Sequence, residues 1–160
     1  MYKLNKLKIN SKILKQIYYS LIYPYLFYNC VSYSGTFDVH LHRVVILQKR
    51  AIRILSRASY FEHTDPLFAR HKILKFEDVC RLSLGLYVYD NLDSFNAISH
   101  NYNTRNSSNL RPARSRLSIT QNSIEVTGPN LWNDIPPDIQ NSISREVFKH
   151  KYKTYLLSFY

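Results

Sequence analysis

Residues 37–56 have the sequence FDVHLHRVVILQKRAIRILS, in which apolar and basic residues recur with the period of an α-helix. At about 100° per residue, the apolar side chains gather on one side; they are Leu41, Val44, Val45, Leu47, Ala51, Ile52 and Leu55. An opposite arc of about 120° holds His42 and five cations that we call the basic ridge: Arg43, Lys49, Arg50, Arg53 and Arg57. The stretch predicts an amphipathic helix, with Thr36 as its N-cap.

The five like charges of the basic ridge repel one another, so the arrangement lowers stability unless negative charge meets it. Two interpretations stay open. In the first, the ridge faces the phosphates of a nucleic acid. In the second, it is a solvated face that forms salt bridges to Glu62, Asp65, Glu77 or Asp78.

Upstream of this stretch, Asn10 or Ser11 can cap a helix that runs to about residue 31 and that Pro24 kinks or splits near Tyr23. Residues 16–37 carry no charge, but they include six tyrosines and Pro24. We therefore expect a buried core helix and no membrane partner. The amino terminus lacks the cleavage site of a secretory signal.

Downstream, helical patterns cover residues 65–71 and 77–91, and a polar linker follows at 93–100. Alternation at 114–120 and 123–127 predicts two short strands joined by a turn at 121–122. A Gly-Pro turn at 128–129 then brings Trp132 to a buried position, one helical turn covers 137–141, and Ser144 caps a last helix. The predicted fold is mainly α, with four to five helices and a small β-hairpin or extended region after residue 100. Residues 1–92 form a helical region and residues 93–160 the remainder, together one compact unit.

The net charge of the 160-residue chain is +11 and is unevenly spread. Residues 1–60 carry ten Lys or Arg against one acid, residues 61–100 four against six, and residues 101–160 eight against four. Two basic regions that flank a neutral one favour a polyanionic partner, although a basic surface that only aids solubility is a competing interpretation.

Residues 102–116 form a polar arm in which four arginines alternate with Asn and Ser; they are Arg105, Arg111, Arg114 and Arg116. These residue types donate hydrogen bonds to phosphates, and Tyr102 can stack on a base. The alternative interpretation is structural, with Arg105 binding backbone carbonyls or an acid such as Asp90.

The residues of common catalytic sites are not recognisable. The chain has no Asp-Asp pair, and its adjacent acids Glu77 and Asp78 open a helix, where they suit the helix dipole. Its His and Cys residues lack the close spacing of a zinc site, and Cys30 and Cys80 are expected to be reduced and buried. We expect no metal, no cofactor and no catalysis by this chain alone.

The order of several segments resembles the carboxy-terminal, thumb and post-thumb region of reverse transcriptases from jockey-like non-LTR retrotransposons. The segments are IYYSLIYPYL (17–26), LQKRAIRI (47–54), HTDPLF (63–68), YNTRNSSNLR (102–111), GPNLWNDIP (128–136) and FKHKYKTYLL (148–157). The resemblance covers nearly the whole chain. In that family the endonuclease and the polymerase palm, which holds the paired carboxylates, lie upstream of this region.

The resemblance implies a non-catalytic fragment of an RNA-directed DNA polymerase that grips an RNA–DNA hybrid or duplex DNA through basic surfaces. Its partners would be that nucleic acid and the upstream polymerase domain of the same element, in the nucleus or cytoplasm. Two alternatives are a structural module that docks on the polymerase body and a degenerate element remnant without a selected role.

Overall fold

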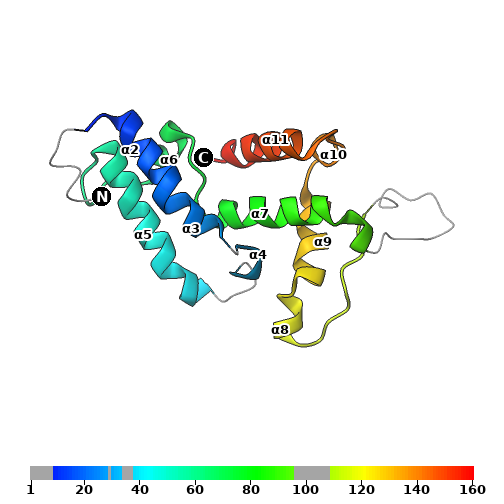
Figure 1. Ribbon diagram of the computed structural model, residues 1–160. Helices are drawn as coiled ribbons and strands as arrows, with labels where there is room; N and C mark the ends of the chain where they lie inside the picture. Colours follow the sequence, from blue (N-terminus) through cyan, green and yellow to red (C-terminus); the bar gives the residue numbers. More distant parts are fainter. Residues whose placement is uncertain (1–8, 29, 34–37, 96–108) are drawn as a thin grey trace. The chain divides into compact units, whose positions relative to one another are not determined.

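The computed structural model describes residues 9–28, 30–33, 38–95 and 109–160 (Figure 1). Contacts divide the chain into two compact units. Unit 1 comprises Met1–Tyr28, Phe37–Val79 and Leu156–Tyr160, and unit 2 comprises Asn29–Thr36 and Cys80–Tyr155. The two units follow contacts rather than sequence order and therefore alternate along the chain.

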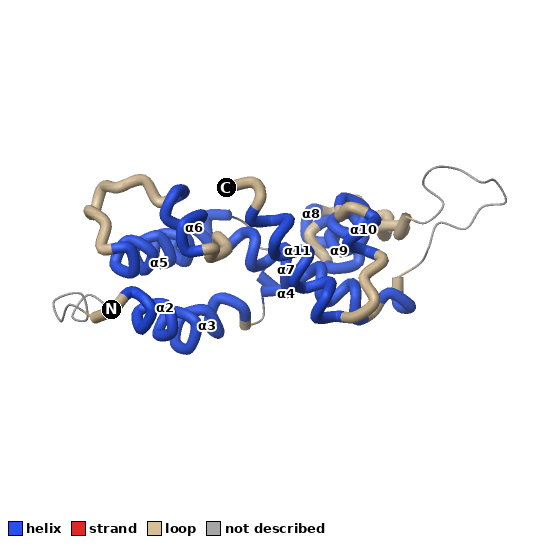
Figure 2. The backbone as a smooth tube through the Cα atoms, turned by 90° about the horizontal axis from the view of Figure 1, so that it is seen from above, coloured by secondary structure: helices blue, strands red, loops and turns tan. Residues whose placement is uncertain are grey.

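The mainly α fold is confirmed: Figure 2 shows helices and loops and no strand over the described ranges. The predicted hairpin is wrong. The short helix α8 (Ser118–Gln121) overlaps the end of its first strand, and all but the first residue of its second strand lies in α9 (Ile124–Asp134). Gly128, Pro129 and Trp132 are buried at helical spacing on α9, so the burial of one helix face overrides the short alternation at 123–127.

The expected Gly-Pro turn at 128–129 is also wrong, because Pro129 lies inside α9. A proline has no N–H, so the carbonyl of Glu125, four residues earlier, loses its helical partner. Here the N–H of Ala113 donates to the Glu125 oxygen at 3.1 Å. The loop before α8 therefore satisfies the oxygen that the proline leaves, and Trp132 is buried as predicted, with 5% of its surface exposed.

In unit 1, the predicted first helix begins as expected at α2 (Ser11–Ile17), where the side chain of Asn10 accepts the N–H of Lys12 at 3.0 Å. It then widens into the π-helical turn η1 (Tyr18–Ile22), continues as α3 (Tyr23–Phe27), and is followed by the separate short helix α4 (Cys30–Tyr33) of unit 2. Pro24 at the start of α3 cannot donate to the preceding turn, and the Tyr23 N–H bonds to the Tyr18 oxygen instead.

The helix predicted at 37–56 is α5 (Asp38–Ser56), which lies beside α2 and runs in the opposite direction (Figure 1). The next helix, α6 (Asp65–His71), has the predicted bounds, contacts α5 and has Thr64 as its N-cap. The predicted helix at 77–91 is α7 (Phe76–Asp90), whose first residues belong to unit 1 and whose remainder belongs to unit 2.

A buried glutamine links three segments of unit 1. Gln48 of α5 is 2% exposed, and its Nε2 donates to the Tyr18 hydroxyl at 3.0 Å and to the Leu74 carbonyl at 2.9 Å. Its Oε1 accepts the N–H of Phe76 at 2.8 Å. Burial raises the pKa of Tyr18 to about 12, against a smaller lowering by the Gln48 hydrogen bond, so the phenol stays neutral.

Unit 2 is held by aromatic packing between the end of α7, α9 and α11 (Arg145–Leu157). The ring of Phe148 stacks on Tyr89 at a centroid distance of 4.8 Å and on Trp132 at 5.6 Å. Tyr152 extends the row at 5.6 Å from Phe148. Two short elements, η2 (Leu92–Ser94) and α10 (Pro137–Gln140), complete the unit, and the latter matches the single turn predicted at 137–141.

The Gln48→Leu variant should lower the free energy of unfolding by roughly 2–5 kcal/mol, because it leaves buried donors and acceptors of Tyr18, Leu74 and Phe76 without a partner. Urea denaturation followed by far-ultraviolet circular dichroism measures this change. The matched control is Gln16→Leu at an exposed position of α2, which should change stability by less than about 0.5 kcal/mol. Equal effects of the two substitutions would contradict this role of Gln48.

The Gly85→Ala variant tests the packing of unit 2, because a Cβ at Gly85 would lie 2.8 Å from a ring carbon of the buried Tyr152. Alanine favours a helix over glycine by about 1 kcal/mol, but overpacking costs about 1–3 kcal/mol, so we expect net destabilisation. Denaturation followed by Trp132 fluorescence reports on this unit. The control is Asn130→Ala on the exposed side of α9, which should leave the free energy of unfolding unchanged or raise it. Stabilisation by Gly85→Ala would contradict the prediction and show that Tyr152 moves aside freely.

Candidate nucleic-acid interface

The structure confirms the amphipathic character of α5. Ala51, Ile52 and Leu55 are buried, whereas Arg43, Arg50 and Arg57 of the basic ridge are exposed, and Lys49 and Arg53 are half-buried. One apolar residue departs from the prediction: Leu47 is 62% exposed. By helical spacing Leu47 borders the ridge next to Arg43 and Arg50, so the exposed face of α5 combines cations with an apolar side chain.

Two arginines of the ridge donate to backbone carbonyls of unit 1. The Nε of Arg53 donates to the Glu62 oxygen at 2.9 Å, and Nη2 of Arg57 donates to the Ile9 oxygen at 2.7 Å. A carbonyl carries no net charge, so these hydrogen bonds order the side chains without neutralising them.

The salt bridges of the alternative interpretation do not form among the described residues. Asp65 pairs with Lys75 at 3.0 Å, and that hydrogen bond is the main reason why the pKa of Asp65 is lowered; Lys49 adds only a weaker, longer-range attraction. Asp78 accepts a hydrogen bond from the Tyr160 hydroxyl at 2.6 Å. Within the part of the chain that the structure describes, no ridge cation is in contact with a carboxylate.

Arg57 lies at the carboxyl end of α5 in a conformation that arginine seldom adopts. Its φ is 54°, in the left-handed region. The Arg57 N–H bonds to the Ile54 oxygen at 3.2 Å and the Ala58 N–H to the Arg53 oxygen at 2.9 Å, the pattern in which glycine usually follows a helix. An arginine in this conformation costs about 1–2 kcal/mol, although a cation at a helix carboxyl end interacts favourably with the helix dipole.

The same geometry recurs at the end of α6, where Lys72 has a φ of 53° and its N–H bonds to the Ala69 oxygen at 3.0 Å. The two helix ends are joined by a contact of 2.9 Å between His71 Nε2 and Ser56 Oγ, in which the donor depends on the imidazole tautomer. In addition, Lys15 of α2 donates from Nζ to the His71 carbonyl at 2.7 Å.

A hollow of about 340 Å³ lies at this junction. We call it the α5–α6 hollow; its lining residues are Asn10, Ser11, Leu55, Ser56, Arg57, Arg70 and His71. Burial first, and then the positive charges of Lys15 and Arg70, lower the pKa of His71. Of the described residues, two arginines and no acid line this hollow, and they give it a positive electrostatic potential.

Beside the ridge, an exposed aromatic pair that sequence reasoning missed occupies a turn. Tyr60 is 63% and Phe61 90% exposed, and their rings meet edge to face at a centroid distance of 5.1 Å. The Glu62 N–H bonds to the Ser59 oxygen at 3.2 Å, and the Ser59 N–H bonds to the Glu62 carboxylate at 3.2 Å. Since Arg53 also binds the Glu62 carbonyl, the turn presents both rings to solvent from a fixed position.

The arm is described only from residue 109 onward. Arg111, Arg114 and Arg116 are exposed residues of unit 2, whereas Arg105 and Tyr102 lie outside the described residues. The Leu110 backbone makes two 2.9 Å hydrogen bonds to the side-chain amide of Asn133, which hold this end of the arm to α9.

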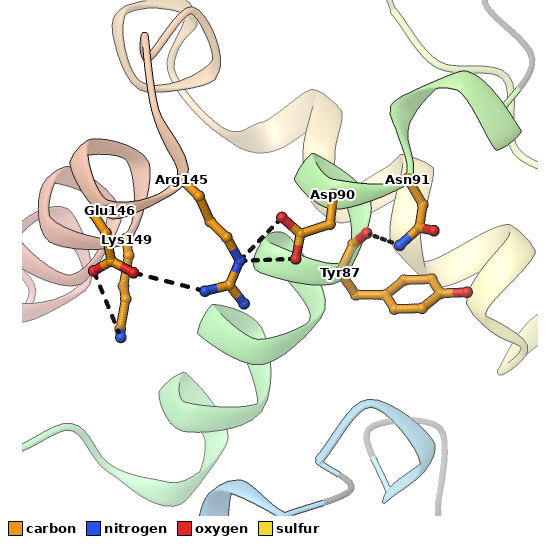
Figure 3. Close-up of polar contacts among 6 residues, drawn as sticks. All are labelled: Tyr87, Asp90, Asn91, Arg145, Glu146 and Lys149. Carbon is orange, nitrogen blue, oxygen red and sulfur yellow. Dashed lines mark hydrogen bonds and ion pairs between the residues drawn. The ribbon is translucent and has the colours of Figure 1, made fainter.

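Asp90, the acid considered as a partner of Arg105, is in an ion pair with Arg145. The Nε of Arg145 donates to the two carboxylate oxygens of Asp90 at 3.0 and 2.9 Å, which joins the end of α7 to the start of α11 (Figure 3). Glu146 lies beside this pair, with an oxygen 3.8 Å from Arg145 and another 3.9 Å from Lys149. Asp90 therefore has a structural role within unit 2.

The acidic pair at 77–78 also has a structural role. The Tyr160 hydroxyl accepts the N–H of Lys75 at 2.6 Å and donates to Asp78, which is 8% exposed. Burial and this bond to Asp78 raise the pKa of Tyr160. The contact attaches Tyr160 to the start of α7 and gives Asp78 a structural role.

Cys30 and Cys80 are both buried free thiols, as predicted, and a hydrogen bond between them lowers the pKa of Cys30. Among the described residues, no group of three or more His, Cys, Asp or Glu side chains could hold a metal ion. A search of the same residues finds no helix with the length and apolar character that crossing a membrane requires.

Of the residues predicted to bind nucleic acid, the structure brings Arg43, Lys49, Arg50, Arg53 and Arg57 together on unit 1. It places Arg111, Arg114 and Arg116 on a separate loop of unit 2. Comparison with protein-family models, with curated proteins and with solved structures finds no match to this chain.

Proposed function

We propose that this chain is a non-catalytic, nucleic-acid-binding part of a non-LTR retrotransposon reverse transcriptase, and that the basic ridge of α5 contacts the template–primer hybrid or duplex DNA. The observation that carries the proposal is the uncompensated charge of the ridge. Arg43 and Arg50 are exposed, and Arg53 and Arg57 donate to carbonyls instead of carboxylates. A row of phosphates would supply the missing negative charge.

The surroundings of the ridge support a contact that depends little on sequence. The cations of the ridge would pair with phosphates of the nucleic-acid backbone. Beside the ridge, Tyr60 and Phe61 offer flat apolar surfaces on which a base or sugar can pack. Arg111, Arg114 and Arg116 of the arm would add a second, independent set of phosphate contacts.

A second candidate function is a module that docks on the polymerase body, and exposed apolar side chains favour it. Leu21, Tyr25 and Tyr28 are 62%, 82% and 77% exposed along η1, α3 and the residue after it. Clustered apolar exposure is typical of protein interfaces. The two functions are compatible, because the α2–α3 side chains and the basic ridge can serve different partners.

Substitution of the ridge tests the nucleic-acid proposal. The double variant Arg43→Gln/Arg50→Gln removes two exposed cations that make no hydrogen bond to a loop in the described part of the chain, and glutamine maintains the helix. Each phosphate contact on duplex DNA contributes a slope of about −0.9 to log K against log salt concentration, so the slope should flatten by about two units. Fluorescence anisotropy with labelled duplex and hybrid measures it.

Lys149→Gln/Lys151→Gln is the matched control, because it removes the same net charge from α11 outside the predicted interface. A slope that changes equally in both double variants would mean that only the net charge matters. Duplex binding unaffected by the ridge variant would favour the docking function.

Arg111→Gln should have a smaller effect that adds to that of the ridge variant if the arm is an independent contact.

Catalysis offers a separate test. The proposal places no carboxylate pair for two metal ions in this chain, so residues 1–160 with primer, template, nucleotides and magnesium or manganese should extend no primer. Gel analysis of a labelled primer measures extension. Template-dependent synthesis above that of a heat-inactivated sample would contradict the assignment.

A further inference from the structure

The α5–α6 hollow has the properties of a ligand site rather than of a helix junction alone. It gathers side chains from three stretches of unit 1: Asn10 and Ser11 from the start of α2, Arg57 from the end of α5, and Arg70 and His71 from the end of α6. Its volume of about 340 Å³ lies at the low end of pockets that hold small organic groups.

The charges around the hollow lack a counter-ion among the described residues. Arg57 and Arg70 both line it, Lys15 reaches the carbonyl of His71, and no carboxylate is present in the lining. Three cations that converge without an acid repel one another, and an anion would relieve the repulsion.

Several hydrogen-bond donors of the hollow remain available. An arginine has five N–H donors, and Arg57 has one bond to the Ile9 carbonyl. No hydrogen bond engages the Arg70 guanidinium or the Ser11 hydroxyl among the described residues. Asn10 uses its side-chain oxygen for the Lys12 N–H, which leaves its amide N–H₂ group to donate.

The backbone of Arg57 gives an independent indication. The left-handed conformation at this position would suit glycine without strain, yet the residue is an arginine that lines the hollow. Strained residues are typical of sites where a side chain must occupy one particular place.

We propose that the α5–α6 hollow binds a phosphate group, with Arg57 and Arg70 as the charged ligands and Asn10 and Ser11 as neutral donors. The assignment of this phosphate to a nucleic acid rests on the proposed function. The binding of phosphate by the hollow does not depend on that function. A strand that runs along the basic ridge reaches the hollow at Arg57, where a terminal phosphate or an internal phosphodiester would enter it.

His71 is the natural reporter of binding. Its charged neighbours are Lys15, Arg57 and Arg70, all positive, and its side chain contacts Ser56. A bound anion stabilises the imidazolium, so the lowered pKa of His71 should rise when phosphate enters. Nuclear magnetic resonance of the whole chain follows the imidazole signals, and the His71→Asn variant identifies the one that belongs to His71.

The test titrates inorganic phosphate at constant ionic strength and at fixed values from about pH 5 to about pH 8. A saturable upward shift of the His71 pKa is expected, and backbone amides of Ser11, Arg57 and Arg70 should shift with the same affinity. Acetate in place of phosphate is the control for carboxylates. No saturable shift, or an equal response to acetate, would overturn the phosphate site.

Variants locate the site. Arg57→Gly relieves the backbone strain while it removes the guanidinium, and Arg70→Gln changes an exposed position, so both should fold. Each should weaken phosphate affinity about tenfold or more, since a hydrogen bond to a charged group is lost. Arg43→Gln, about 21 Å earlier along α5, should change the phosphate affinity by no more than about twofold. An equal loss of affinity in that variant would mean that only the net charge of the protein matters.

Competition identifies the source of the phosphate. A short oligonucleotide with a 5′-phosphate that displaces inorganic phosphate better than its 5′-hydroxyl counterpart assigns a terminal phosphate, and equal displacement by both assigns an internal phosphodiester. Displacement by neither overturns the link to nucleic acid. A failure of the proposed function looks different: duplex binding is then insensitive to Arg43→Gln/Arg50→Gln, while phosphate still shifts His71.

Discussion

The buried side chain of Gln48 determines how α5 sits in unit 1. Its amide bonds to Tyr18 of η1, to Leu74 before α7 and to Phe76 at the start of α7, and these three bonds fix the rotation of α5 about its axis. A buried amide without hydrogen-bond partners would lower the free energy of unfolding. Gln48 and Arg50 lie about 200° apart around the helix, so the rotation that buries Gln48 turns Arg50 and its neighbours towards solvent.

The chemistry of the ridge follows from what its arginines bind. Carboxylate partners would have cancelled its charge and left a neutral face, whereas the carbonyls of Ile9 and Glu62 only order Arg57 and Arg53. These two arginines therefore combine a structural with a proposed binding role. Among the described residues Arg43 and Arg50 have no such loop contact, which is why substitutions there separate nucleic-acid binding from folding.

Helices with a long, regular period were predictable from the sequence, as α5 and α7 show, and the short helix α6 was predictable from the proline in its first turn. The predicted hairpin at 114–127 failed because its alternation is short and because the sequence does not show that Ala113 donates to the Glu125 carbonyl, which Pro129 leaves without its helical partner. A single-sequence pattern does not contain that tertiary contact.

The candidate site likewise has one part that the sequence predicted and one part that it did not. Helical spacing alone placed the five ridge cations on one face of α5. The α5–α6 hollow could not be predicted, because it needs Arg57 in a left-handed conformation and brings Asn10 next to His71 through folding. The exposure of Tyr60 and Phe61 likewise depends on tertiary structure, because Arg53 of α5 holds their turn from outside through the Glu62 carbonyl.

The most direct test of the central claim observes the arginine side chains themselves. Nitrogen-15 spectra of the Nε–H groups, recorded with and without a short RNA–DNA hybrid, report which guanidinium groups meet phosphates. The account predicts that the Arg43 and Arg50 signals shift and exchange more slowly with water, while Arg145, bound to Asp90, does not change. Signals of Arg43 and Arg50 that stay unchanged at saturating hybrid would contradict it.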